Sequence, residues 1–202
     1  MQSQNKYIGD DKFIKMLEHY SCSASIDVVK LRFAGAISSP NLNLRPTDVI
    51  SSLWEKNKQP RLQTKEEAEL FFKFFMGLWD DTFQKVKNNQ ISLPVFKIQN
   101  KTDLKNLCLE RYEQIEAGFL EGFWGGQENL QIPAFIAQII DSLNDLANIY
   151  LQLQNRSITD SEFENLVKTI NHTDKMVNSS FAFIIKNFVL PRFEQITQTN
   201  TN

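Results

Sequence analysis

The chain has 202 residues, of which 42% are hydrophobic and 23% charged, and its formal net charge at pH 7 is -2. This balance is typical of folded globular proteins and excludes collagen-like, disordered and disulfide-rich classes. The first half of the chain is net basic and the second half net acidic, but neither half is basic enough to indicate a nucleic-acid-binding surface.

Apolar residues recur at three- and four-residue spacing, and only seven glycines and six prolines interrupt them, which predicts an all-α fold. In the first half we expect helices over residues 10–20 and 25–37, a short helix that Pro46 opens, and a long helix that begins at Thr64. Thr64 and Glu67 form the T-x-x-E pattern of a capping box. The apolar stripe of the long helix is wide enough to pack on two sides, so we expect this helix to be the central element of the core.

In the second half, residues 88–101 contain Pro94 and are expected to form a loop. Thr102 is the expected cap of the next helix, which Gly125-Gly126 ends. Pro133 opens another helix, and the T-x-x-E pattern at Thr159 begins the last helical region, in which polar residues 172–180 allow a break. We therefore predict a single compact all-α domain of about seven helices over residues 1–195, with a frayed tail at 196–202.

Gly118 and Gly122 lie one turn apart inside a predicted helix, where each glycine costs about 1 kcal/mol relative to alanine. A helix that carries two such glycines is expected to let another element approach closely. We expect the gap to be filled by an aromatic side chain from residues 71–79. The alternative is that the gap forms a groove for a partner.

The sequence contains few residues that favour catalysis or metal binding. Four residues complete a zinc quartet by number, but structural zinc sites draw their ligands in close pairs, and two of the four have no such neighbour: His19, Cys22, Cys108 and His172. Free thiols are the better interpretation, and with only two cysteines we predict reduced thiols in a cytoplasmic protein. No metal and no cofactor is expected.

Carboxylates give no catalytic pattern either. The pairs Asp10-Asp11 and Asp80-Asp81 lack the third aspartate of the magnesium-binding motifs of helical isoprenoid enzymes, so helix capping and exposed charge explain them better. Glu110, Glu113 and Glu116 are expected on the solvated face of their helix. Phosphate loops, dinucleotide-binding turns and nucleophile elbows are absent from the sequence. We expect no catalytic residue.

The order of several short motifs resembles the YecA/YgfB family of small bacterial helical proteins. The resemblance covers residues 25–126, and residues 131–195 would add further C-terminal helices. In chain order, the motifs that carry it are Ser39-Pro40, Pro46-Thr47-Asp48-Val49, Leu53-Trp54, Glu66-Glu67-Ala68, Met76 with Trp79, and Gly118-Phe119 with Gly122.

The resemblance implies an all-helical fold, no established enzymatic activity and a role in protein-protein interaction or regulation. The family positions, expected to serve in the core or in interaction, are Pro40, Trp54, Glu67, Trp79, Gly118, Phe119 and Gly122. Many members of the family carry a C-terminal cysteine-rich zinc tail, which has no counterpart in this sequence, so no zinc-dependent docking is expected.

We therefore predict a non-catalytic interaction or regulatory module with an unidentified protein partner. A homodimer is compatible with the sequence. No nucleic acid and no membrane is expected as a partner, because the longest apolar stretch is far shorter than the roughly 20 residues of a membrane span. Two alternatives remain: a binder of a small apolar ligand in a cavity lined by some of the 16 phenylalanines, and a metal hydrolase.

Overall fold

The computed structural model describes residues 6–55, 58–127 and 129–199, with side chains as far as residue 195. These residues form helices and loops and contain no strand. The helices are α1 (Asp10–His19), α2 (Ile26–Ser38), α3 (Pro46–Ser51), α4 (Lys65–Lys87), α5 (Lys101–Glu113), η1 (Gln114–Leu120), α6 (Glu121–Trp124), α7 (Ala134–Asn155), α8 (Asp160–Ile184), η2 (Ile185–Val189) and α9 (Leu190–Thr199).

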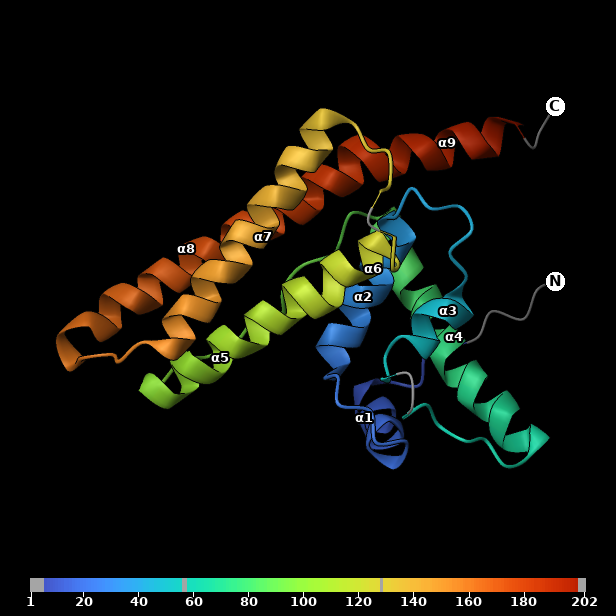
Figure 1. Cartoon of the computed structure of the whole chain (residues 1–202), viewed down its shortest axis with the longest axis horizontal. Coiled ribbons are helices and arrows are strands. Elements are labelled where there is room, and N and C mark those ends of the chain that lie inside the picture. Colours follow the sequence, from blue (N-terminus) through green and yellow to red (C-terminus); the bar gives the residue numbers. More distant parts are fainter. Residues whose placement is uncertain (1–5, 56–57, 128, 200–202) are drawn as a thin grey trace.

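Some of these elements follow one another without a break and form two long composite helices, so the described residues form seven helical rods (Figure 1). One long rod joins α5, η1 and α6, and the other joins α8, η2 and α9, where η1 and η2 are π-helical segments. The predicted all-α fold of about seven helices is confirmed.

Local sequence explains most helix ends. The Thr64 side chain accepts a hydrogen bond from the backbone N–H of Glu67, and Thr159 with Glu162 forms a complete capping box. Gly125, with φ of 55°, ends α6 in the left-handed region that glycine adopts at low cost. The expected cap at Thr102 is wrong, because Asn100 caps α5 by accepting from the backbone N–H of Asp103.

The last rod is continuous where a break was allowed. Helix α8 runs through residues 172–180, and the irregular segment is η2, which ends two residues before Pro191. Proline lacks an N–H and collides with the carbonyl four residues earlier, and a widened π turn accommodates both effects. Helix α9 extends to Thr199, past the expected end of the helical domain at residue 195, whereas residues 200–202 of the expected tail lie outside the described residues.

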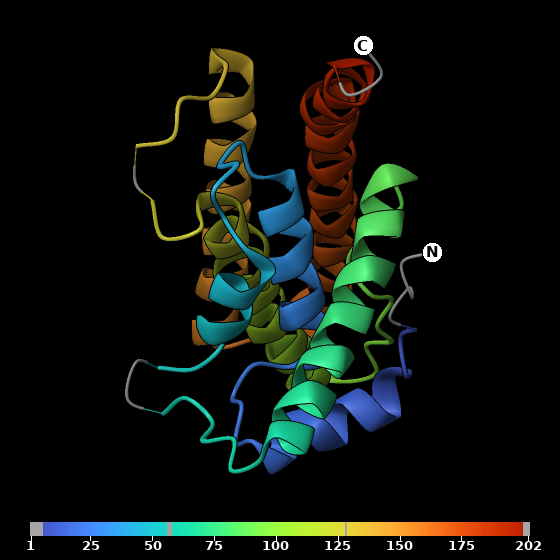
Figure 2. The ribbon, with the colours of Figure 1, turned by 90° about the vertical axis from the view of Figure 1, so that its right-hand side faces the viewer.

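The helices form an arm and a body that meet at α2. In Figures 1 and 2, α5, α7 and α8 form the arm, α1, α3 and α4 form the body, and α2 lies between them. The two hydrophobic clusters largely follow the same division, except that Val86 near the end of α4 belongs to the arm cluster. Leu31, Ala34 and Ile37 of α2 belong to the arm cluster, whereas Val29 and Phe33 belong to the body cluster.

Helix α2, not α4, is therefore the central element, which corrects the expectation from the sequence. Eleven of its 13 residues are buried. Helix α4 buries one face only: Leu70 is 52% exposed and Phe72 38%. In the described part of the chain, no helix is both long and apolar enough to cross a bilayer.

Candidate functional site

The predicted glycines lie where two helices touch through their backbones. A Cβ atom added to Gly122 would overlap the carbonyl oxygen of Arg32 on α2, and one added to Gly118 would lie 3.1 Å from Cβ of Leu31. On the facing helix, a Cβ on Gly35 would overlap the carbonyl oxygen of Phe119. The predicted close approach is thus present, but the occupant is the backbone of α2 and not an aromatic side chain from residues 71–79. The backbone of α2 therefore fills the gap at Gly118 and Gly122, where the alternative prediction placed a groove for a partner.

Arg32 stabilises this contact between α2 and the α5–η1–α6 rod with hydrogen bonds that no sequence pattern predicted. Its side chain is 9% exposed, Nε donates to the carbonyl of Ala117 at 2.7 Å, and Nη1 donates to the carbonyl of Ser52 at 2.6 Å. Ala117 lies in η1, where the wider turn changes the usual backbone pairing. Arg32 therefore joins α2, η1 and the end of α3 in one contact.

A second buried arginine joins the helices of the arm. Arg111 on α5 is 1% exposed, and its Nη2 atom donates to Asp174 on α8 at 3.0 Å and to the carbonyl of Pro94 at 2.6 Å. The Tyr150 hydroxyl on α7 donates to the same Asp174 carboxylate at 2.6 Å, and Arg111 Nη1 donates to Gln114 at 2.7 Å. These hydrogen bonds and the ion pair with Asp174 compensate the buried charge of Arg111, which a dry interior requires.

The chemistry of this network favours a structural role over an activated site. Burial raises the pKa of the Cys108 thiol to about 12, and burial together with Asp174 raises the pKa of Tyr150 above its ordinary value. A thiol or phenol becomes a nucleophile or base near neutral pH when its pKa is lowered. Both groups are shifted in the opposite direction.

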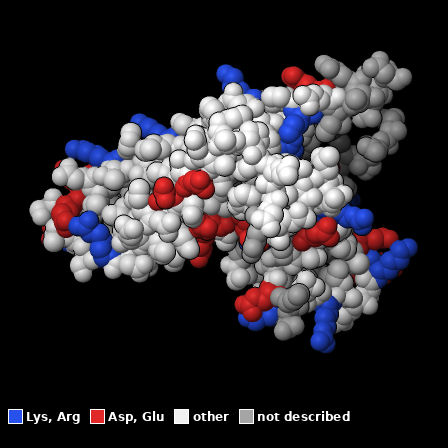
Figure 3. Space-filling model, turned by 45° about the horizontal axis from the view of Figure 1, so that its top comes forward, with Lys and Arg blue, Asp and Glu red and all other residues white. Residues whose placement is uncertain are grey.

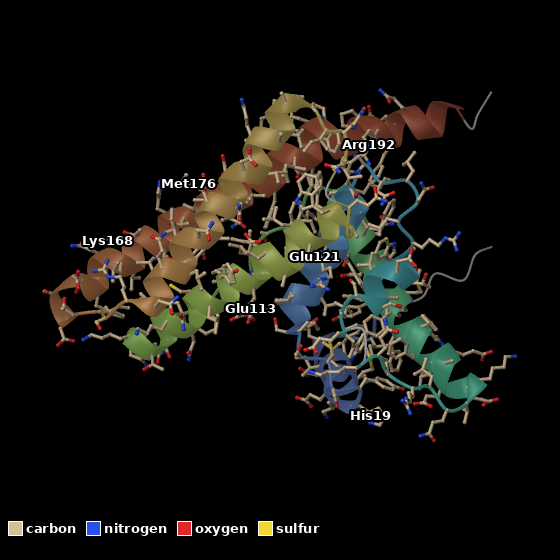
Figure 4. All side chains as sticks on the ribbon, in the orientation of Figure 1. His19, Glu113, Glu121, Lys168, Met176 and Arg192 are labelled. Atoms are coloured by element: carbon tan, nitrogen blue, oxygen red, sulfur yellow. The ribbon has the colours of Figure 1, made fainter. Side chains whose placement is uncertain are left out.

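The three glutamates of the α5–η1 rod do not share one solvated face, which corrects the expectation for two of them. Glu113, which is labelled in Figure 4, is exposed, but Glu110 and Glu116 are partly buried. Desolvation raises the pKa of both carboxyl groups. Oε1 of Glu116 is buried and has no hydrogen-bond partner among the described residues.

The residues weighed as metal ligands do not assemble. In the ranges that the structure describes, no three His, Cys, Asp or Glu side chains lie close enough to hold a metal ion. Asp10 is exposed, as expected, and accepts from Lys30 at 2.6 Å, whereas Asp81, which pairs with Lys85 at 2.8 Å, is partly buried, as is Asp80. Cys22 and Cys108 are free.

Two of the predicted family positions, Trp54 and Glu67, are brought together beside a surface groove. Trp54 is 6% exposed and its Nε1 donates to the carbonyl of Tyr20 at 2.9 Å. The Tyr20 hydroxyl donates to Glu67 Oε1 at 3.1 Å, and Tyr20 packs edge-on against Phe71. The Gln63 N–H, with Tyr20, lowers the pKa of Glu67, so this carboxylate is ionised and fixed.

The groove lies between α1 and α4, at the lower end of the body in Figure 2, and has a volume of about 480 Å³. Its floor is apolar, with Met16 and Phe71 buried, and its α4 rim carries the exposed Leu70. Lys15 and His19 line the α1 side, where Figure 4 labels His19, and Glu66 lines the α4 side with Glu67. The groove therefore has an apolar floor, a basic edge on α1 and an acidic edge on α4.

The other family positions lie apart from this groove. Phe119 is fully buried in the arm and packs against Phe181 with its ring tilted and the ring centroids 4.5 Å apart. Trp79 packs against both hydrophobic clusters and its ring centroid lies 5.1 Å from that of Phe33. Pro40 follows the end of α2, where Arg192 donates to the carbonyl of Ser39 at 2.7 Å.

Neither the family models nor the curated proteins nor the solved structures with which the chain was compared include a match to it. The resemblance to the YecA/YgfB family therefore stays a prediction.

Proposed function

We propose that this chain is a non-catalytic interaction module that receives an amphipathic helix of a partner protein in the groove between α1 and α4. The observation that carries the proposal is the exposure of Leu70, 52%, on the rim of an apolar groove of about 480 Å³. A groove between two helices with a buried aromatic floor suits the apolar face of a third helix.

The edges of the groove specify the partner further. Lys15 and His19 form one edge and Glu66 the other, so a complementary helix carries acidic residues along one side of its apolar stripe and basic residues along the other. Such a helix would place apolar residues at positions i, i+3 or i+4, and i+7 against Leu70 and Phe71.

The proposal includes membership of the YecA/YgfB family and a cytoplasmic location in a bacterial cell. The motif order supports the family, and the free thiols Cys22 and Cys108 are compatible with a reducing compartment. The role in interaction that the resemblance implies agrees with the groove. The proposal assigns no catalytic residue, cofactor or nucleic acid.

Site-specific photo-crosslinking in lysate tests the groove directly. A photoreactive amino acid is placed at Leu70 or, as the control, at Leu42, which is 81% exposed on a loop away from the groove. We expect one protein to crosslink from position 70 and not from 42, through a segment with the amphipathic pattern above. Equal crosslinking from both positions, or none from position 70, contradicts the proposal.

The same groove is the best site for the second candidate function, the binding of a small apolar ligand. Its volume lies within the range of small-molecule sites, roughly 300–1,000 Å³. Native mass spectrometry of the purified chain and of Leu70→Glu separates the two functions. A bound mass that the variant loses supports the ligand, whereas an unliganded wild-type chain leaves the groove to a partner helix.

A further inference from the structure

The α7–α8 pair carries an apolar stripe on its outer face, in addition to the stripe that it buries. Phe135 and Ile149 on α7 are 45% and 39% exposed, and Met176 and Phe183 on α8 are 45% and 41% exposed. Between these exposed residues, the partly buried Ile139 and the buried Leu146 line a groove of about 620 Å³ between the two helices. A row of large apolar side chains that is this long and this exposed indicates an interaction surface.

Opposite charges border this face. Asp141 and Asp145 are exposed on α7, whereas Lys168 and Lys175 are exposed on α8. Within the residues that the structure describes, none of these four side chains has an ion-pair partner. Figure 3 shows this upper side of the arm as a broad uncharged band with basic atoms toward its outer edge and acidic atoms on the other side. The face thus has an acidic edge and a basic edge, and both are unpaired.

One contact between the two antiparallel helices sets how far along the groove each residue lies, which we call its level. The rings of Phe135 and Phe183 lie 6.3 Å apart, edge to face. Asp145 lies ten residues after Phe135 and Lys175 eight residues before Phe183, which places them about 15 Å and about 12 Å along the groove from that contact. By the same spacing, Ser142 and Met176 are level with each other.

A second copy of this face complements the first. A two-fold axis parallel to the groove lays α7 of one copy over α8 of the other and keeps every residue at its level. Asp145 of each copy then faces Lys175 of the other copy, so the pair forms twice. Met176 of each copy meets the small Ser142 of the other, and the apolar stripes cover one another.

We propose that the outer face of α7 and α8 is the interface of a two-fold symmetric homodimer in which Asp145 pairs with Lys175 of the second copy. The 22 residues of α7 span about 33 Å, and two helices side by side are about 20 Å wide, so the α7–α8 face of each copy has an area of about 660 Å². A standard stable interface buries roughly 800 Å² on each partner. This interface lies on the arm and goes beyond the function proposed for the groove of the body.

Charge reversal with complementation tests the arrangement by sedimentation velocity. We expect the wild-type chain, at concentrations up to about 100 μM, to sediment with a mass near twice 23.4 kDa. Asp145→Lys alone and Lys175→Glu alone should each raise the dissociation constant at least about tenfold, because two attractions become two repulsions. Lys97→Glu, an exposed charge reversal in the loop before α5, should leave the constant unchanged.

The mixture of the two single variants is the decisive measurement. In a heterodimer of Asp145→Lys with Lys175→Glu, each position 145 faces an opposite charge at position 175, so an equimolar mixture should dimerise as the wild type does. Circular dichroism melts confirm that each variant is folded. A monomeric wild type, single variants that dimerise normally, or a mixture that stays monomeric would each overturn the proposal. None of these outcomes affects crosslinking at Leu70, which tests the groove separately.

Discussion

Substitution of Gly122 by alanine tests the backbone contact between α2 and α6. In an ordinary helix interior, Gly→Ala stabilises by about 1 kcal/mol. Here the added methyl group would overlap the carbonyl oxygen of Arg32, and would lie 2.9 Å from its carbonyl carbon and 3.0 Å from the backbone nitrogen of Ala36. All three atoms belong to the backbone of α2, so relief requires the whole helix to move.

The magnitude follows from three contributions. Overpacking of a filled core costs about 1–3 kcal/mol. Movement of α2 also weakens the hydrogen bonds from Arg32 to Ala117 and Ser52, and the loss of one bond to a charged group costs about 1.5–3 kcal/mol. After the gain of about 1 kcal/mol in helix propensity, we expect a net loss of about 2 kcal/mol. For a chain of this length, that lowers Tm by about 4–8 °C.

Gly118→Ala is the matched control on the same rod. Its Cβ atom would lie 3.1 Å from Cβ of Leu31 and 3.3 Å from the carbonyl oxygen of Val28, which small adjustments relieve. We expect a change within about 1 kcal/mol of zero, because this adjustment and the helix propensity offset each other. Urea unfolding followed by circular dichroism measures both variants. A Gly122→Ala variant as stable as the wild type, or equal losses at both glycines, would show that α2 does not contact this helix through its backbone.

Three further predictions concern buried ionisable groups. Arg111→Met should destabilise the fold by about 3–5 kcal/mol in urea unfolding, because it leaves the Asp174 carboxylate without its charged partner and with only the Tyr150 hydroxyl donating to it; Arg111→Met with Asp174→Leu should cost less, and equal losses would refute the pairing. Because burial raises the pKa of Glu116, the folded state holds this proton more tightly than the unfolded state, so stability falls as the pH rises from the ordinary carboxyl pKa through the raised value. Glu116→Gln should therefore be more stable than the wild type at pH 7 and equal to it below about pH 4, as thermal melts would measure. A wild type that is more stable than the variant at pH 7 would contradict the raised pKa of Glu116. In thiol labelling with an aromatic disulfide, the half-buried Cys22 should react slowly in the folded chain and Cys108 only on unfolding, and rapid labelling of both would contradict the burial.

The helices could be predicted from the sequence because each depends on its own residues. The spacing of apolar residues gave the helices, and short-range caps such as Thr64 and Thr159 set where they begin. The cap of α5 was missed because Asn100 and Thr102 are both good caps, and the choice depends on the register that Leu104 and Leu107 adopt in the core.

The assembly of the helices could not be predicted in the same way, because it depends on contacts between distant residues. Arg32 and Arg111 pair with groups 85 and 63 positions away, and nothing near either residue distinguishes it from a surface arginine. One indication was available: Gly35 lies inside a predicted helix, and the argument applied to Gly118 and Gly122 applies to it equally. Gly77 lies inside the predicted long helix as well, so the helical glycines alone would have left both α2 and α4 as candidate partners for that contact.

The position of α2 also links the two proposed surfaces. The backbone contacts at Gly35 and Gly122, with Arg32 between them, hold the arm against the body, and Arg192 fastens α9 to the end of α2. A dimer formed through the arm would therefore present two α1–α4 grooves at one fixed separation. A partner with two helices at that separation would bind both grooves, and its second contact would be intramolecular and far stronger than a single site. Asp145→Lys should then weaken the binding of a two-helix partner while leaving the affinity for a single helix unchanged, as calorimetry with each would measure. Equal weakening of both would show that the substitution perturbs the groove itself.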